Sequence, residues 1–250
     1  MSWRRLGILL TVVVVMAVGL ILVFFPRSNA TEQETPSPNY RQMRLAMVQA
    51  LVNAEILQTE SVIKAMQATR RHLFVPPEVR PLAYLDTPLP IGEDQTISAP
   101  SIVAKMTELL KPQKEHIVLE VGTGSGYQAA VLAKLVKHVY TIEILEPLAT
   151  SAAQRLAGLR YENVTVKCGD GYQGWSEHAP FDGIIVTCAP EEIPQPLVEQ
   201  LKEGGRMVIP VGPESGIQQL YLLEKEGGSM KQTAIWLVRF VPMTGEAQQP

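Results

Sequence analysis

Metal-binding and disulfide-forming residues are scarce in this 250-residue sequence, which contains two cysteines and four histidines. Two cysteines cannot build a disulfide framework and cannot by themselves form a zinc site. The histidines show no spacing typical of metal ligands. We therefore predict no metal centre.

A large excess of positive or negative charge is also absent. Lys and Arg number 22 against 25 Asp and Glu, so the formal net charge is -3, and the only basic run that stands out is Arg4-Arg5. A nucleic-acid-binding protein would be expected to carry a basic patch, so we predict no nucleic-acid partner. The composition, 46% hydrophobic and 19% charged, is that of a globular protein rather than a disordered one.

One long apolar run is present, at residues 6–25, directly after Arg4 and Arg5. About 20 apolar residues can span a bilayer as a helix. Pro26 ends the run, and small residues at 28–30 offer a site for a signal peptidase. We expect residues 1–30 to be an uncleaved membrane anchor, with a cleaved signal peptide as the alternative. A buried core helix fits less well, because the run has no polar face. The positive charge before the run predicts that the rest of the chain is exported.

The remaining chain divides by its pattern. Residues 31–39 are polar and contain two prolines, which is typical of a linker. Residues 40–111 show helical spacing of apolar residues, interrupted by a proline-rich stretch at 74–94 that we expect to be irregular. We predict a helical N-terminal subdomain here, and a short tail at 246–250.

Between residues 112 and 245 the pattern alternates between strand and helix. We expect five strands, at 117–121, 139–142, 164–166, 181–186 and 207–211, with helices at 127–135, 147–159 and 196–201. Apolar runs at 217–223 and 235–240 resemble a closing antiparallel pair. Such alternation predicts an α/β fold of the Rossmann-like kind: a seven-stranded, mostly parallel sheet with helices on both faces.

The strongest local motif, LEVGTGSGY at residues 119–127, joins the first of these strands to a helix. Glycines let a chain turn tightly and approach a ligand closely. A dinucleotide fingerprint would place its third glycine at Tyr127, so the spacing differs from that pattern. A carboxylate in the turn would repel a pyrophosphate but suits a cationic ligand such as S-adenosylmethionine. An ordinary turn would not need three spaced glycines. The predicted cofactor-binding residues are Glu120, Gly122, Thr123, Gly124, Ser125 and Gly126.

Acidic residues end the next two strands. Glu143 is placed to accept hydrogen bonds from both ribose hydroxyls of a nucleoside. Asp170 stands before Gly171, where its carboxylate could receive the amino group of adenine; the alternative is a plain Asp-Gly turn. We add Glu143, Asp170 and Gly171 to the predicted cofactor site.

Several sequence motifs, taken in their order along the chain, match those of a known family. They are PLPIG at 88–92, QTISAP at 95–100, residues 118–133, residues 181–189, GGRMVIPVG at 204–212 and RFVPMTG at 239–245. From about residue 41 to 245 the chain resembles the protein-L-isoaspartate O-methyltransferase family. The hydrophobic N-terminus and the acidic pair Glu93-Asp94 depart from the family pattern. Members are usually cytosolic, which makes the cytoplasm the alternative location.

The resemblance implies that S-adenosylmethionine methylates the free α-carboxylate of isoaspartyl residues in damaged proteins, which initiates their repair through a succinimide. It implies that Thr96, Ile97 and Ser98 contact the substrate, with Ser98 as the catalytic residue that orients the carboxylate. We expect a monomer. Ser98 could instead only cap a helix that begins near Pro100. Two other functions stay open: methyl transfer to another acceptor, and a catalytically silent, membrane-tethered binding module.

Overall fold

The computed structural model describes residues 38–246. The expected anchor, nearly all of the expected linker and most of the expected tail lie outside the described residues. Between residues 38 and 246, no helix has both the length and the apolar character that a membrane span requires.

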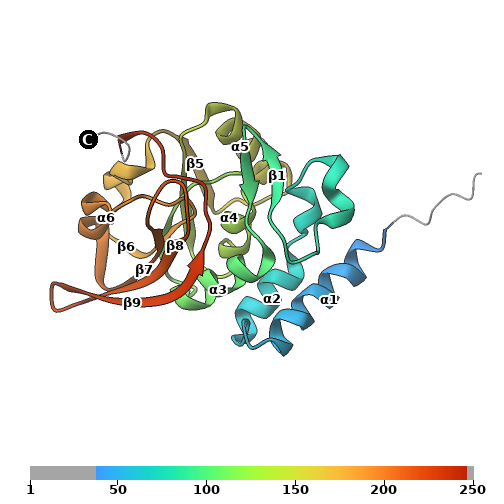
Figure 1. The fold of residues 1–250 in the computed structure, drawn as a ribbon, viewed down its shortest axis with the longest axis horizontal. Helices are drawn as coiled ribbons and strands as arrows, with labels where there is room; N and C mark the ends of the chain where they lie inside the picture. Colours follow the sequence, from blue (N-terminus) through green and yellow to red (C-terminus); the bar gives the residue numbers. More distant parts are fainter. Residues whose placement is uncertain (1–37, 247–250) are drawn as a thin grey trace, which may run out of the picture. The chain divides into compact units, whose positions relative to one another are not determined.

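A seven-stranded sheet forms the centre of the fold, with the order β5-β4-β3-β6-β7-β8-β9 (Figure 1). The first five strands in this order run parallel, and β8 and β9 are antiparallel to their neighbours. The strands are β3 (Ile117–Val121), β4 (His138–Glu143), β5 (Val164–Cys168), β6 (Phe181–Val186), β7 (Leu201–Val211), β8 (Gln218–Glu226) and β9 (Ser229–Val238). The predicted fold class is confirmed.

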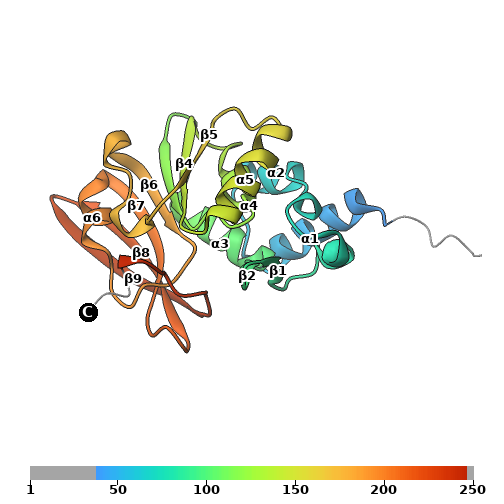
Figure 2. The ribbon, with the colours of Figure 1, turned by 90° about the horizontal axis from the view of Figure 1, so that it is seen from above.

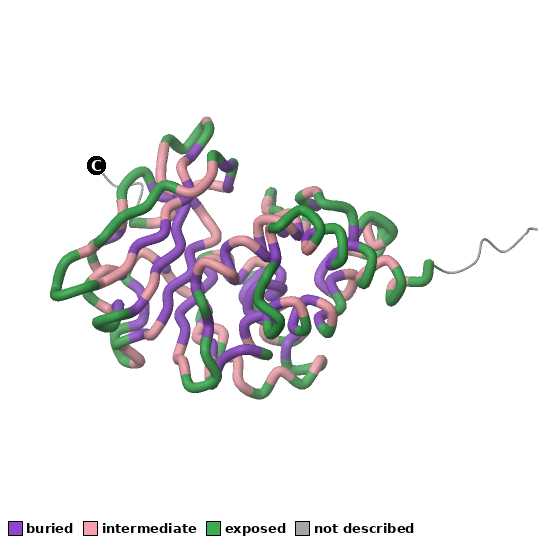
Figure 3. The backbone as a smooth tube through the Cα atoms, turned by 90° about the horizontal axis from the view of Figure 1, so that it is seen from below, coloured by how far each residue is buried: buried purple, intermediate pink, exposed green. Residues whose placement is uncertain are grey.

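The central strands are buried on both faces, which Figure 3 shows as a purple core. In β3, Val118 packs into the core on one face, while Leu119 and Val121 belong to the core on the other. Successive side chains of a strand point to opposite faces. Glu120 therefore lies on the same face as Val118.

Helices cover both faces, as predicted. On one side lie α3 (Pro100–Leu110), α4 (Tyr127–Leu132) and α5 (Glu146–Gly158); on the other lie α6 (Gln195–Gln200) and the short 3-10 helices η3 (Gly171–Gln173) and η4 (Ser176–His178). Figure 2 shows α6 across the sheet from α3, α4 and α5.

The N-terminal part consists of α1 (Tyr40–Asn53), α2 (Glu60–Ala68) and the 3-10 helices η1 (Arg71–Leu73) and η2 (Pro77–Leu82). Its buried residues Val48 and Met66 share one hydrophobic cluster with Val103 of α3 and Leu132 of α4. The core of this part is thus continuous with the core under the sheet.

A small hairpin, β1 (Leu89–Gly92) with β2 (Gln95–Ile97), precedes α3. The prediction of an irregular segment up to residue 94 was wrong here. Pro90 suggested a loop, but a proline is tolerated in an edge strand because no ladder hydrogen bond needs its nitrogen. The turn residues Glu93 and Asp94 have φ angles of 51° and 54°, the left-handed conformation that tight hairpin turns require.

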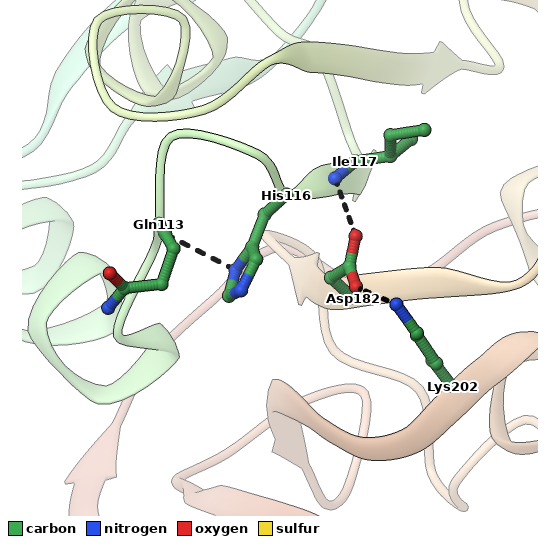
Figure 4. A network of polar contacts seen from close by, with 5 residues as sticks. All are labelled: Gln113, His116, Ile117, Asp182 and Lys202. Atoms are coloured by element: carbon green, nitrogen blue, oxygen red, sulfur yellow. Dashed lines mark hydrogen bonds and ion pairs between the residues drawn. The ribbon is translucent and has the colours of Figure 1, made fainter.

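Polar contacts fix the amino ends of the central strands (Figure 4). Asp182 of β6 accepts a hydrogen bond from the backbone N–H of Ile117 at 2.8 Å and forms an ion pair with Lys202 at 2.7 Å. Although partial burial acts in the opposite direction, these two partners hold the pKa of Asp182 below its usual value. The pair β3–β6 is thereby held at the edge opposite the carboxyl ends of the strands.

Five of the seven strands differ from their predicted bounds, and the largest differences are in β7 and β9. β7 begins at Leu201 rather than residue 207, and β9 runs over Ser229–Val238 rather than 235–240. The added residues of β9, such as Lys231 and Gln232, are polar and exposed. They pair with β8 at the sheet edge, where no apolar pattern is needed because one side faces water.

Candidate active site

A cavity of about 920 Å³, partly open to solvent, lies at the carboxyl ends of β3 and β4. Open α/β sheets bind ligands at this edge. Ten of the predicted site residues line the cavity: Thr96, Ile97, Ser98, Glu120, Gly122, Thr123, Gly124, Ser125, Glu143 and Gly171. Gly126 and Asp170 are not among the lining residues. The cavity therefore brings together the predicted cofactor and acceptor residues, although they come from four separate parts of the chain.

The glycine-rich turn leaves β3 with positive φ at Gly122 (96°), Gly124 (53°) and Gly126 (87°). A Cβ at Gly122 would collide with the hydroxyl of Thr187, which donates a hydrogen bond to the carbonyl of Gly122 at 2.6 Å. A Cβ at Gly126 would press on Leu156 of α5. Gly126 is the N-cap of α4 and belongs to the packing of the turn, whereas Gly122 and Gly124 face the cavity.

Glu143 ties this turn to the end of β4. One carboxylate oxygen accepts the backbone N–H of Gly124 at 2.7 Å, and the other accepts that of Leu145 at 3.1 Å. The side chain is nearly buried but lines the cavity. Each carboxylate oxygen can accept more than one hydrogen bond, so Glu143 retains acceptor capacity toward the cavity.

Asp170 does not line the cavity, and its carboxylate binds backbone groups. Its Oδ1 accepts the backbone N–H of Tyr172 at 2.9 Å, and its Oδ2 accepts that of Glu246 at 2.7 Å. The side chain thus caps η3 and holds the C-terminal segment, while the neighbouring Gly171 reaches the cavity.

Glu120 is fully buried on the cavity wall, and within residues 38–246 neither of its oxygens has a hydrogen-bond partner. Burial raises the pKa of this carboxyl to about 8; the hydroxyl of Thr141 opposes the shift, and the nearby charge of Glu143 adds to it. A buried charge without a partner is unfavourable. A cationic ligand in the cavity would supply the missing partner.

Ser98 follows β2, is half-buried and lines the same cavity. The N-cap residue of α3 is Ala99. In the first turn of this helix, the backbone N–H of Ser101 donates a hydrogen bond to Asp86 Oδ1 at 2.8 Å. Within the described residues Ser98 makes no hydrogen bond. The alternative that Ser98 caps α3 is therefore wrong, and its hydroxyl is available to a ligand.

The C-terminal segment forms a wall of the cavity that sequence reasoning did not assign to the site. Residues 241–244 line it. Their backbone is held by two hydrogen bonds of 2.8 Å, from Ala189 to Val241 and from Met243 to Ala189. The sequence does not mark these residues as part of a binding site, since Val241, Pro242 and Met243 carry no charged or catalytic group. Only the pairing with the loop after β6 brings them to the cavity.

Polar residues from other elements also line the cavity without having been predicted. Gln128 of α4 donates a hydrogen bond to Thr107 at 3.0 Å. Cys188 lies beside Thr187; burial, and then the charges of Glu143 and Asp170, raise the pKa of its thiol to about 12. This thiol therefore stays neutral at physiological pH and is no activated nucleophile.

Comparisons with known proteins agree with this arrangement. The family model described as protein-L-isoaspartate(D-aspartate) O-methyltransferase matches residues 42–248. "Protein-L-isoaspartate O-methyltransferase 2" from Syntrophobacter fumaroxidans is 59% identical over 185 residues, which cover 74% of this chain and 75% of that protein. A protein of the same name from Shewanella sediminis is 47% identical over 91% of this chain and 93% of its own length.

Solved structures give the same result. One named protein-L-isoaspartate O-methyltransferase superposes with a TM-score of 0.75 and 30% identity, covering 82% of this chain and 67% of that one. Another, from Plasmodium falciparum and described as being in complex with S-adenosyl-L-homocysteine, has a TM-score of 0.70 and 26% identity, covering 80% of this chain and 98% of that one. The chain therefore belongs to the protein-L-isoaspartate(D-aspartate) O-methyltransferase family and is an S-adenosylmethionine-dependent protein carboxyl methyltransferase.

Proposed function

We propose that this one cavity binds S-adenosylmethionine along the glycine-rich turn and presents the α-carboxylate of an isoaspartyl residue at Ser98. The observation that carries the proposal is the placement of two unpartnered groups in one cavity: the buried carboxylate of Glu120 and the free hydroxyl of Ser98. The first suits a cationic cofactor and the second suits an anionic acceptor.

The residues of the turn fit the cofactor. Gly122 and Gly124 leave the backbone open on the cavity side, and Glu143 retains lone pairs for the ribose hydroxyls. Glu120 would receive the ammonium group of the methionine moiety. Gly171 would lie toward adenine, and Asp170 would act by holding the loop that carries Gly171.

The reaction requires little acid-base chemistry from the protein. Bound S-adenosylmethionine supplies a methyl group attached to a positively charged sulfur. A carboxylate acceptor is already ionised at neutral pH, so no general base is needed. Ser98 donates a hydrogen bond to one carboxylate oxygen and leaves the other free to receive the methyl group. Ile97, Val103 and Met106 line the cavity and exclude water from the aligned groups.

The direct test compares two peptides that differ only in one linkage. We expect methyl transfer to an isoaspartyl peptide and none to the matched aspartyl peptide. Equal transfer to both, or transfer to small carboxylates or amines only, would indicate a methyltransferase for another acceptor. Cofactor binding without any transfer would indicate a silent binding module.

The raised pKa of Glu120 predicts that cofactor binding depends on pH. A proton must leave Glu120 before it can pair with an ammonium group. Affinity for S-adenosylhomocysteine should therefore increase from about pH 6 to pH 7.5, by at most about tenfold per pH unit, and level off above the pKa of about 8. Calorimetry in buffers with different ionisation enthalpies should show that binding releases a proton.

Glu120→Gln is the control for this effect, because it keeps the shape of the side chain and removes its titration. The variant should bind more weakly at pH 7.5 and lose most of the pH dependence. If the parent protein releases no proton on binding, Glu120 does not pair with the ammonium group.

We further propose that residues 1–30 anchor the protein in a membrane or direct its export, on the evidence of the apolar run after Arg4-Arg5. Full-length protein should fractionate with membranes, or a shortened form should appear outside the cytosol. Detection of the full-length chain in the soluble cytosolic fraction alone would contradict this. Deleting residues 1–37 should leave activity intact and keeps Asn39, whose side chain caps α1. We also expect a monomer, which light scattering of this shortened chain can test.

A further inference from the structure

A second cavity, of about 490 Å³, adjoins the active site on the far side of the glycine-rich turn. Ser125 lines both cavities. Ile91 of β1 lines the second cavity, and its Cδ1 lies 3.3 Å from where a Cβ of Gly124 would stand. The second cavity thus begins at the turn and lies against the hairpin that leads to Ser98.

Two arginines give this second cavity its charge. Arg80 comes from η2 and Arg155 from α5, and no Asp or Glu is among its described lining residues. Most of the other lining residues are apolar, including Phe74, Val75 and Leu148. The protein has a net charge of -3, so the pairing of two cations here does not reflect a general excess of positive charge.

The arginines are only partly satisfied by the protein. Arg155 donates to the carbonyl of Ser125 at 2.9 Å and to the hydroxyl of Ser151 at 3.1 Å. Burial, and then the charge of Arg80, lower the pKa of Arg155. The Nε of Arg80 is buried and has no hydrogen-bond partner within the described residues. Neither arginine is part of the ion pairs found between residues 38 and 246.

Two like charges on half-buried side chains repel each other, and an anion between them would remove that repulsion. The guanidinium group is planar and matches a carboxylate with paired hydrogen bonds. We propose that Arg80 and Arg155 form a subsite for an acidic side chain of the acceptor polypeptide, close in sequence to the isoaspartyl residue that is methylated. This inference rests on the proposed function.

The surroundings favour a polypeptide as the source of the carboxylate. Leu82 and Leu85, which follow Arg80 in the chain, are 44% and 52% exposed, and such apolar side chains can contact a bound chain. The exposed hairpin tip carries Glu93 and Asp94, so it repels acidic residues. An acidic residue of the acceptor should therefore bind on the Arg80 side of the hairpin.

The test uses isoaspartyl peptides of one length, with a single Glu moved from three positions before the isoaspartyl residue to three positions after it. Each peptide is paired with one that carries Gln at the same position. For the parent protein we expect kcat/KM to favour Glu over Gln by about three- to fivefold at one or two positions, the effect of a partly solvated charge pair. In Arg80→Gln this ratio should fall to about one.

Arg41→Gln is the matched control. It removes the same charge from the exposed surface of α1 and should leave the Glu preference unchanged. The subsite is overturned if the parent shows no preference at any position, if Arg80→Gln retains it, or if Arg41→Gln loses it equally. A raised KM for S-adenosylmethionine in Arg80→Gln, with the peptide preference retained, would assign the arginines to the carboxylate of the cofactor instead. If none of the peptides is methylated, the proposed function itself fails.

Discussion

Replacing Ser98 by Ala should lower turnover with isoaspartyl peptide on the order of a hundredfold, while the affinity for S-adenosylhomocysteine changes little. Ser98 lines the cavity and makes no hydrogen bond within the described residues, so its loss leaves no buried partner unsatisfied. What it removes is the hydrogen bond that aligns the acceptor oxygen, and misalignment of a reacting atom can cost about this much in rate. Steady-state kinetics and calorimetry on the same preparation measure both quantities.

Ser101→Ala is the control, because Ser101 lies three residues further on, in the first turn of α3, and does not line the cavity. This variant should retain the turnover of the parent. Ser98→Thr keeps the hydroxyl and should retain more activity than Ser98→Ala if the cavity has room for the added methyl group. A folded Ser98→Ala protein with turnover within about twofold of the parent would show that Ser98 does not position the carboxylate.

Replacing Gly124 by Val should abolish measurable binding of S-adenosylhomocysteine, a loss of at least about a hundredfold in affinity, which corresponds to roughly 2.7 kcal/mol. Gly124 has a φ of 53° and lines the cavity. Its nearest neighbour toward an added Cβ is the flexible end of Ile91, at 3.3 Å. A valine side chain would therefore press on Ile91 and strain the left-handed backbone, and both effects would shift the turn that lines the cofactor cavity. Calorimetry measures the loss.

Gly227→Val separates this local effect on the cofactor turn from a general loss of stability through backbone strain. Gly227 has a similar φ of 61° in the turn between β8 and β9, and nothing lies within 4 Å of an added Cβ. Both variants should lose a comparable amount of stability, on the order of 1–3 kcal/mol, but only Gly124→Val should lose the ligand. Equal affinities in the two variants would show that the cofactor does not pass close to Gly124.

Much of the fold could be predicted, because its signals are local. The apolar runs of β3 and β6 predict buried parallel strands, and their bounds in the structure, Ile117–Val121 and Phe181–Val186, are those predicted. The hairpin β1–β2 was missed because Pro90 interrupts a short edge strand and because its turn uses Glu93 and Asp94 in place of glycine. At Pro90 and in the Glu93-Asp94 turn, the intrinsic conformational preference of the residues disfavours the strand and the left-handed turn that the surrounding structure stabilises.

The sequence by itself determined which residue types stand at the ends of β3, β4 and β5: a glycine-rich turn, a glutamate and an aspartate. The tertiary structure decided what each of them does. It directed Asp170 to the backbone of Tyr172 and Glu246, and it joined Glu143 to Gly124.

Three further features of the site depended on the tertiary structure alone. Within the described residues, the carboxylate of Glu120 is buried without a hydrogen-bond partner. Asp86 binds the N-terminus of α3, so the hydroxyl of Ser98 is not needed there. Residues 241–244 form one wall of the cavity. The physical reason is one of range. Strand periodicity and turn chemistry act between near neighbours in the chain. Hydrogen-bond partners and burial depend on segments that the fold brings together from positions as far apart as Gln95 and Thr244.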